Sequence, residues 1–295
     1  MHHFQVGICA ISLAFTLSPM CAHAQGSHAR DACSLKNVAE DASVVRMPID
    51  VVDGRAYVQV RVNGKGPFRF AVDTGASGDA RVDMVLVRSL GLPRTGAGTS
   101  ADAIQTAAVE KVSLESLALG GLEKKHLQVT ARDYRSRTAA EFSGILARDF
   151  FANGLLVLDF PNRMLTFSPS SSLPRQAAGA IGYEKAFRIP VQIGQQRVLG
   201  NLDTGADVSF VLPMSLYARV QATPLVDAGN ASLTNTTSRM KSTTIHDTIR
   251  IGTEAFTGAD ARVVDGFPEL LIGSRVISRY VVLIDQRTQT LALCK

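Results

Sequence analysis

Two short stretches, FAVDTGAS at 70–77 and GNLDTGAD at 200–207, decide the fold of this chain. Each contains Asp-Thr-Gly after a short apolar segment, so each Asp is expected where a β-strand gives way to a turn. One such tripeptide would be weak evidence, because short motifs recur by chance. Two copies in matching surroundings, with Asp73 and Asp203 at corresponding places, indicate a duplicated unit.

The similarity between the two halves extends well beyond the tripeptides. GILARDFFANGLLVLDFPNRMLTF at 144–167 corresponds to LLIGSRVISRYVVLIDQRTQTLAL at 270–293. Both segments predict a strand, a small residue (Ala147 or Gly273), a short helical turn, and two further strands joined by a tight turn. A repeat of this length is too long for a solenoid unit, so we expect two similar lobes that face each other.

The remaining patterns predict an all-β fold with two pseudo-symmetric barrel-like lobes and a few short helices. Period-2 runs bounded by Gly, Pro, Asn and Asp recur along the chain, and helical patterns are best developed at 82–92 and 213–220. We expect an N-terminal extension (25–45), a first lobe (46–168) and a second lobe (183–295). The segment between the lobes, 169–182, is rich in Ser, Pro, Ala and Gly and is predicted to be a linker.

The N-terminus has the pattern of an export signal. An apolar run at 7–17 is too short to span a bilayer comfortably, and AHA at 22–24 offers a cleavage site after Ala24. We therefore predict a signal peptide at 1–24 and a periplasmic or secreted protein that leaves the membrane after cleavage. The segment contains no Lys or Arg, and the alternatives are an uncleaved anchor or a misassigned start codon.

The cysteines, histidines and charged residues indicate a disulfide and give little support to metal or nucleic-acid binding. Cleavage would leave Cys33 and Cys294, which in an oxidising compartment predict a disulfide, with two free thiols as the alternative. No Cys/His set has metal-ligand spacing, so neither a metal nor a cofactor is expected. The net charge of +5 is spread along the chain without a Lys/Arg block, which gives nucleic-acid binding little support.

The two motif carboxylates suggest a shared acid–base centre. If the lobes pack with two-fold pseudo-symmetry, Asp73 and Asp203 meet at the axis, where adjacent carboxyl groups retain one proton between them. One carboxylate can then take a proton from water, while the other hydrogen-bonds a carbonyl oxygen and helps to protonate a leaving nitrogen. Gly75 and Gly205 allow the tight turns that hold these carboxylates.

These residues resemble the pepsin and retropepsin clan of aspartic peptidases, and more narrowly the bacterial exported retropepsin-like proteases, over roughly residues 46–293. The resemblance implies a catalytic dyad of Asp73 and Asp203. It also implies that the two motif threonines hydrogen-bond across the lobe interface, and that the later small residue of each lobe buttresses the catalytic turn. The implied active-site support residues are Thr74, Gly75, Thr204, Gly205, Ala147 and Gly273.

Several positions depart from the clan pattern. Ala147 replaces a Gly of the first lobe, which predicts slight strain or a shifted loop. Ala76 and Ala206 follow the motif glycines where pepsin-like members carry a hydroxyl, so we expect a less acidic dyad and a mildly acidic working pH. By resemblance, Asp207 and its counterpart Ser77 are candidates for binding the substrate backbone.

The resemblance implies an endopeptidase that binds a peptide or protein substrate, extended, in the cleft between the lobes. Residues 94–109 and 226–244 are candidate flaps over that cleft, or else ordinary surface loops. A monomer suffices, since one chain supplies both carboxylates. The alternative function is a pseudoprotease of the same fold that binds or scaffolds peptides without turnover.

Overall fold

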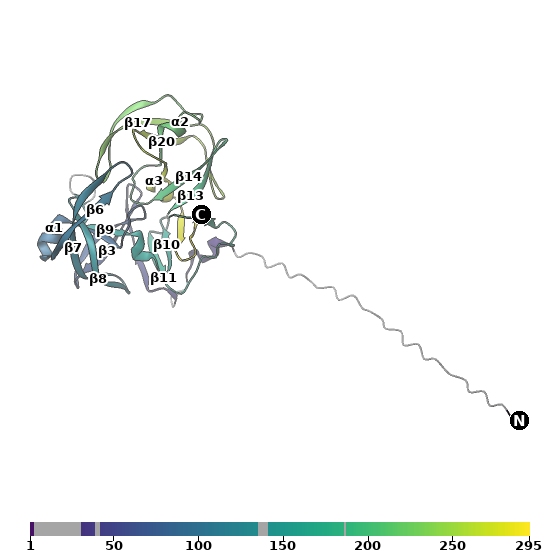
Figure 1. Ribbon diagram of the computed structural model, residues 1–295, viewed down its shortest axis with the longest axis horizontal. Helices are drawn as coiled ribbons and strands as arrows, with labels where there is room; N and C mark the ends of the chain where they lie inside the picture. The colour runs from purple at the N-terminus through teal and green to yellow at the C-terminus, as the bar shows by residue number, and fades with distance from the viewer. Residues whose placement is uncertain (3–30, 39–41, 135–140, 186) are drawn as a thin grey trace.

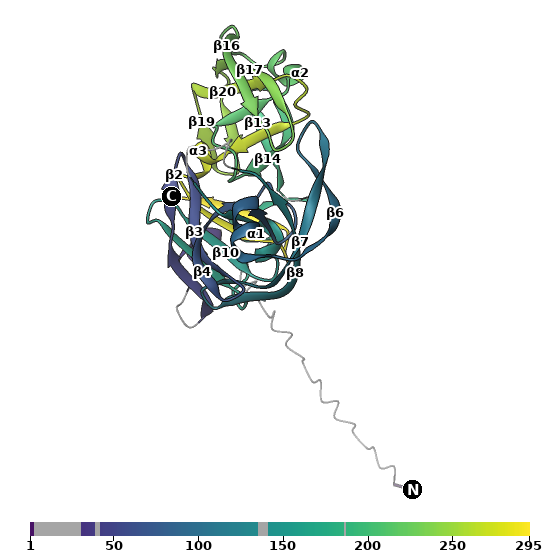
Figure 2. The ribbon, with the colours of Figure 1, turned by 90° about the vertical axis from the view of Figure 1, so that its left-hand side faces the viewer.

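The chain folds into two β-lobes joined by a shared sheet (Figures 1 and 2). The structure is a computed structural model that describes residues 1–2, 31–38, 42–134, 141–185 and 187–295. The predicted signal segment 1–24 therefore lies, apart from its first two residues, outside the described residues. The two-lobed, all-β architecture predicted from the sequence is confirmed.

The first lobe is an eight-stranded sheet that closes on itself through an additional pairing of β3 with β7. A short helix, α1 (Met84–Leu90), begins at Asp83, whose side chain accepts a hydrogen bond from the Val85 N–H. In sheet order the strands are β2 (Asp50–Val52), β3 (Arg55–Val62), β4 (Lys65–Asp73), β9 (Gly144–Ala147), β5 (Ala80–Asp83), β8 (Leu122–Arg132), β7 (Thr106–Leu119) and β6 (Arg94–Ala101).

The second lobe repeats this plan in a nine-stranded sheet. Its one-turn helix α2 (Met214–Tyr217) follows β15 as α1 follows β5, so both helices fall within the ranges expected from the sequence. In sheet order the strands are β16 (Val226–Ser232), β17 (Thr237–Ile245), β20 (Ala259–Val264), β15 (Phe210–Leu212), β21 (Leu270–Gly273), β14 (Gln196–Asp203), β13 (Arg188–Ile193), β18 (Ile249–Ile251) and β19 (Glu254–Phe256).

A six-stranded sheet connects the lobes, because β10 of the first half pairs antiparallel with β22 of the second. Strand β10 reads LLVLD and β22 reads VVLID, and such continuous apolar runs are expected of strands that are buried on both faces. In sheet order the strands are β1 (Val45–Pro48), β11 (Met164–Ser168), β10 (Leu155–Asp159), β22 (Val281–Asp285), β23 (Thr290–Cys294) and β12 (Ile181–Gly182), the last within the predicted linker.

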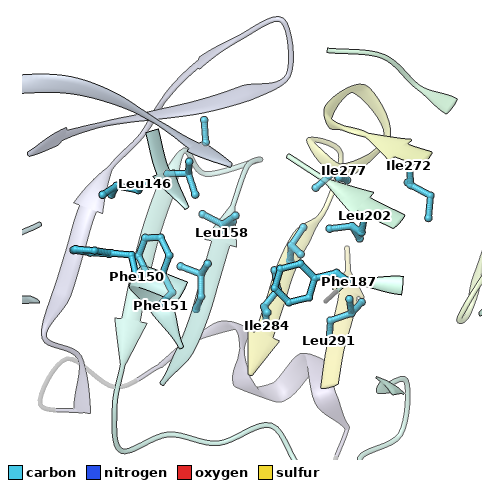
Figure 3. Close-up of a cluster of buried hydrophobic side chains, with 14 of the residues drawn as sticks. Leu146, Phe150, Phe151, Leu158, Phe187, Leu202, Ile272, Ile277, Ile284 and Leu291 are labelled. Carbon is cyan, nitrogen blue, oxygen red and sulfur yellow. The ribbon is translucent and has the colours of Figure 1, made fainter. Parts of the chain in front are cut away.

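One face of this shared sheet belongs to a core that runs through both lobes (Figure 3). Leu158 of β10 and Ile284 of β22 face this core, together with Leu146 beside the first motif and Leu202 beside the second. All four side chains are at most 2% exposed. Because this apolar packing continues from one half of the chain into the other, it holds the two lobes together beside the strands that carry the motifs.

The other face of the shared sheet is covered by the N-terminal segment. The 3-10 helix η1 (Ala32–Lys36) packs on Leu155 and Leu283, and Cys33 forms a disulfide with Cys294 at the end of β23. The predicted disulfide is therefore present, with the two Cα atoms 5.6 Å apart. It fastens the beginning of the described fold to its final strand.

The predicted linker is held to the shared sheet by a buried ionic cluster at the end of β22. The Asp285 carboxylate, with a fully buried side chain, pairs with Arg287 at 2.9 Å and accepts hydrogen bonds from the Leu173 N–H and the Ser172 hydroxyl. Burial raises the pKa of Asp285, but these hydrogen bonds outweigh burial and the pKa is lowered. Among the described residues, no helix is long and apolar enough to cross a membrane.

Candidate active site

The two motif aspartates lie at the ends of equivalent strands. Asp73 ends β4 and pairs in parallel register with Ala147 of β9, while Asp203 ends β14 and pairs with Gly273 of β21. The small residue of each later segment therefore lies directly beside the motif, as the resemblance implies. Each of these segments continues into a short helical turn, η3 (Arg148–Phe151) or α3 (Ser274–Ile277).

The structure brings the two aspartate side chains together, although 130 residues separate them in the sequence. A Cβ atom added to Gly75 would overlap the Asp203 carboxyl group, and one added to Gly205 would overlap that of Asp73. Each motif glycine is therefore required by the carboxylate of the opposite lobe. This reciprocal fit gives the glycines a role in addition to the tight turn that the sequence predicts.

The two motif threonines connect the lobes as the resemblance implies. The Thr74 N–H donates to the Thr204 hydroxyl at 3.0 Å, and the Thr204 N–H donates to the Thr74 hydroxyl at the same distance. The hydroxyls in turn donate to Leu202 O and Val72 O of the opposite lobe, at 3.2 and 2.8 Å. Both threonines are at most 3% exposed, so this reciprocal network is shielded from water and fixes the two turns in register.

The later small residues hold the motif loops through backbone hydrogen bonds. Ala147 N–H donates to Asp79 O at 3.0 Å and Gly273 N–H donates to Ser209 O at 2.9 Å, so the first lobe keeps its buttress despite the alanine. In the second lobe a Cβ at position 273 would collide with Val208 O. At the position equivalent to Val208 the first lobe has Gly78, with φ of +84°, and this different loop conformation accompanies the Ala147 methyl group.

The environment of the carboxyl pair favours retention of a proton. Burial, the negative charge of Asp73 and a hydrogen bond between the two side chains raise the pKa of Asp203 to about 7, against smaller lowering effects of the Gly205 N–H and Arg55. Asp73 accepts a hydrogen bond from the Ala76 N–H at 2.9 Å, and Asp203 accepts one from the Gly205 N–H at 2.8 Å. The pair can therefore present a charged oxygen and a proton donor side by side.

The pair lies in a cleft of about 1090 Å³ lined by both lobes. Asp207 lines this cleft and forms an ion pair with Arg55 of the first lobe at 3.1 Å. The sequence predicts no partner for Asp207, and Arg55 is therefore missed. The two residues lie in different lobes, and no local pattern announces the pairing. Ser77 is exposed and is not among the residues that line the cleft.

A hairpin from each lobe extends over the cleft, and the two hairpins touch. They are β6–β7 of the first lobe and β16–β17 of the second, and they overlap the segments predicted as flaps or surface loops, 94–109 and 226–244. Asn235 donates from its side chain to Ser100 O at 2.6 Å and to Gln105 O at 2.9 Å, and its N–H donates to the Asp102 carboxylate at 2.6 Å. Arg132 donates to the Asn235 side-chain oxygen.

These hydrogen bonds join the hairpins in an interlobe contact centred on Asn235. Burial raises the pKa of Asp102, but hydrogen bonds from Gln105, Ile104 and Asn235 outweigh it and lower the pKa. The carboxylate that holds Asn235 therefore stays charged into moderately acidic solution. The polar composition of both hairpins can be read from the sequence. The contact between them cannot, because it depends on how the two lobes pack.

Residues 58–150 match a family model described as aspartyl protease. The match runs from β3 to η3 and so covers the first motif and Ala147, but not the second motif. It supports an aspartic protease family and, with it, peptidase activity in general. A comparison with curated proteins found no match. Among the described residues, no cluster of His, Cys, Asp and Glu could hold a metal ion.

Proposed function

We propose that this protein is an exported aspartic endopeptidase with Asp73 and Asp203 as its catalytic dyad. The observation that carries the proposal is the contact of these carboxyl groups across the lobe interface, inside a cleft that both lobes line. The family match over 58–150 and the reciprocal threonine network support it. Among known families, the bacterial retropepsin-like proteases with two lobes in one chain are the group we propose.

The proposed reaction needs one proton and one negative charge on the pair. Asp203, with its raised pKa, holds the proton, and Asp73 carries the charge. Asp73 takes a proton from water as the water oxygen attacks the peptide carbonyl carbon, while Asp203 donates its hydrogen bond to the carbonyl oxygen. The C–N bond then breaks as the nitrogen receives a proton from the pair, which returns the dyad to its starting charge.

Substrate binding is proposed to occur along the cleft, beneath the two hairpins. Edge strands and hairpins can pair with the backbone of an extended peptide, and side chains on alternate sides then enter pockets of the two lobes. Because the hairpins are joined through Asn235, their hydrogen bonds must open before a long chain can enter. The contact would close again over a bound peptide and exclude water.

Export to the periplasm or the medium is part of the proposal. The signal-like pattern at 1–24 supports it, and the disulfide between Cys33 and Cys294 is of the kind that persists in oxidising compartments. Expression of the full chain in a bacterial host, followed by fractionation and N-terminal sequencing, tests this part. Retention in the cytoplasm with an intact N-terminus would contradict it.

The enzyme proposal is tested by incubating purified protein with denatured casein between pH 3 and 7. We expect cleavage by the wild type, and at least a roughly 1000-fold loss in both Asp73→Asn and Asp203→Asn, since each variant removes one half of the acid–base pair. Thermal unfolding of all three proteins controls for misfolding. If wild type and variants cleave equally, or if none cleaves, the dyad has no catalytic role.

A further inference from the structure

The two lobes line the cleft with pockets of different chemistry. In the second lobe a cluster of apolar side chains borders the cleft, formed by Val211, Val264, Phe267 and Leu271. In the first lobe the corresponding cluster is mainly aromatic, formed by Tyr57, Tyr134, Phe142 and Ile145. The rings of Tyr134 and Phe142 lie 5.2 Å apart. A peptide across the dyad would therefore meet two unlike surfaces.

Strand register shows where the difference arises. In the second lobe Val211 of β15 pairs with Leu271 of β21, while in the first lobe Arg81 of β5 pairs with Ile145 of β9. Arg81 thus occupies the position of Val211, eight residues after the motif aspartate in each case. Both residues line the cleft. At this equivalent position the second lobe therefore carries an aliphatic side chain, and the first lobe carries a guanidinium.

Arg81 has no carboxylate partner within the described part of the protein. Four other arginines of the cleft pair with carboxylates: Arg55 with Asp207, Arg148 with Asp149, Arg188 with Glu269 and Arg262 with Asp260. Arg81 forms no ion pair with any described carboxylate, although its side chain is half-buried. An unpaired guanidinium in a partly desolvated pocket is costly, and an incoming anion would remove that cost.

Tyr134 places a second donor in the same pocket. Its side chain is buried, and among the described residues no hydrogen bond of good geometry satisfies its hydroxyl. Burial raises the pKa of Tyr134 to about 12, although nearby Arg81 lowers it, so the phenol remains a neutral donor. The Asp83 carboxylate accepts from the Tyr134 N–H at 2.9 Å, which fixes this residue at the cleft wall.

We propose that Arg81 and Tyr134 form a carboxylate-binding subsite in the first lobe, which makes this protein select an acidic group on one side of the scissile bond. The inference rests on the proposed peptidase function. A guanidinium beside a phenol can give a carboxylate several donors at once, and charge-assisted hydrogen bonds are the strong ones. The carboxylate is that of a Glu or Asp side chain or of a free C-terminus. The opposite side of the bond takes an apolar side chain, because Val211 replaces the guanidinium there.

The subsite is tested by profiling cleavage of a random peptide mixture and then measuring kcat/KM for matched peptides. The peptides carry Glu, Gln or Leu at the selected position and an amidated or free C-terminus. We expect Glu to exceed Gln by about 10- to 100-fold, the range of a charge-assisted hydrogen bond. Arg81→Gln should abolish this ratio and Arg81→Lys should keep part of it. Arg275→Gln, which removes an exposed arginine that also lines the cleft, should leave the ratio intact.

The outcomes separate the two proposals. Cleavage by the wild type without acidic preference, or a preference that survives in Arg81→Gln, would overturn the subsite and leave the peptidase intact. An equal loss of preference in Arg275→Gln would show general attraction by the cleft and would also overturn it. Preference for a free C-terminus over an internal Glu would assign the subsite to the terminal carboxylate. Absence of all cleavage, matching Asp73→Asn, would overturn the peptidase and the subsite with it.

Discussion

Replacing Asp203 by Asn tests the electrostatic description of the dyad through protein stability, independently of any substrate. The pKa of Asp203 rises from an ordinary value of 3.8 to about 7, chiefly because the group is buried and faces the charge of Asp73. Each pKa unit corresponds to about 1.4 kcal/mol. Holding this carboxyl in the folded protein therefore costs about 4 kcal/mol at neutral pH, relative to low pH.

The sign of the effect follows from proton binding. Between about pH 4 and pH 7 the folded protein keeps a proton on Asp203 that the unfolded chain has released. Because the folded state then binds more protons, the contribution of Asp203 to the free energy of unfolding decreases as pH rises through this window. The amide that replaces the carboxyl in Asp203→Asn does not titrate, so the variant lacks this decrease. Its stability relative to the wild type should rise by about 3 kcal/mol between pH 4 and pH 7.

Urea unfolding at several pH values between 4 and 7.5 measures this difference. The sequence contains no Trp, so far-UV circular dichroism is the appropriate signal. Asp227→Asn is a suitable control, because Asp227 is exposed near the start of β16 and is not among the residues that line the cleft. If Asp203→Asn and the wild type change in parallel to within about 1 kcal/mol, Asp203 titrates like an ordinary carboxyl and the account of its burial is wrong.

Three further changes test the framework around the dyad. Thr204→Val leaves the Thr74 N–H and Val72 O without buried partners; we expect a loss of about 2–4 kcal/mol by chemical unfolding, and an unchanged midpoint would refute the proposed support. Cys294→Ser removes the disulfide to Cys33, and thermal scans should show a loss of free energy of unfolding on the order of 5 kcal/mol. A reductant should cause the same loss in the wild type and no further loss in the variant. Asn235→Ala removes the side-chain bonds between the hairpins, so hydrogen exchange at 100–107 should accelerate; unchanged exchange would show that other contacts hold them.

The sequence determined the duplicated plan of this protein. The two Asp-Thr-Gly copies, the matching segments at 144–167 and 270–293, and the period-2 apolar patterns predicted two β-lobes. These features can be predicted from the sequence because they depend on local strand and turn preferences and on repetition within one chain. For the same reason, the places of the short helices and of the small residues Ala147 and Gly273 were predictable, whereas the buttressing role of these two residues was implied by the resemblance.

The asymmetric features could not be predicted from local patterns. The ion pair of Arg55 with Asp207 and the contact of Asn235 with the opposite hairpin join residues of different lobes. The position of Arg81 opposite the apolar Val211 became visible only when strand register aligned the two lobes.

Local patterns therefore predicted which residues each lobe contributes, and the packing of the lobes established which of these residues are in contact. The physical reason lies in the range of the interactions. Strand and turn preferences act over a few residues, whereas burial of Asp203, its raised pKa and the pairing of Arg55 arise only when two sheets pack across one axis. The duplication predicts such an axis, but only packing determines the charges that line it.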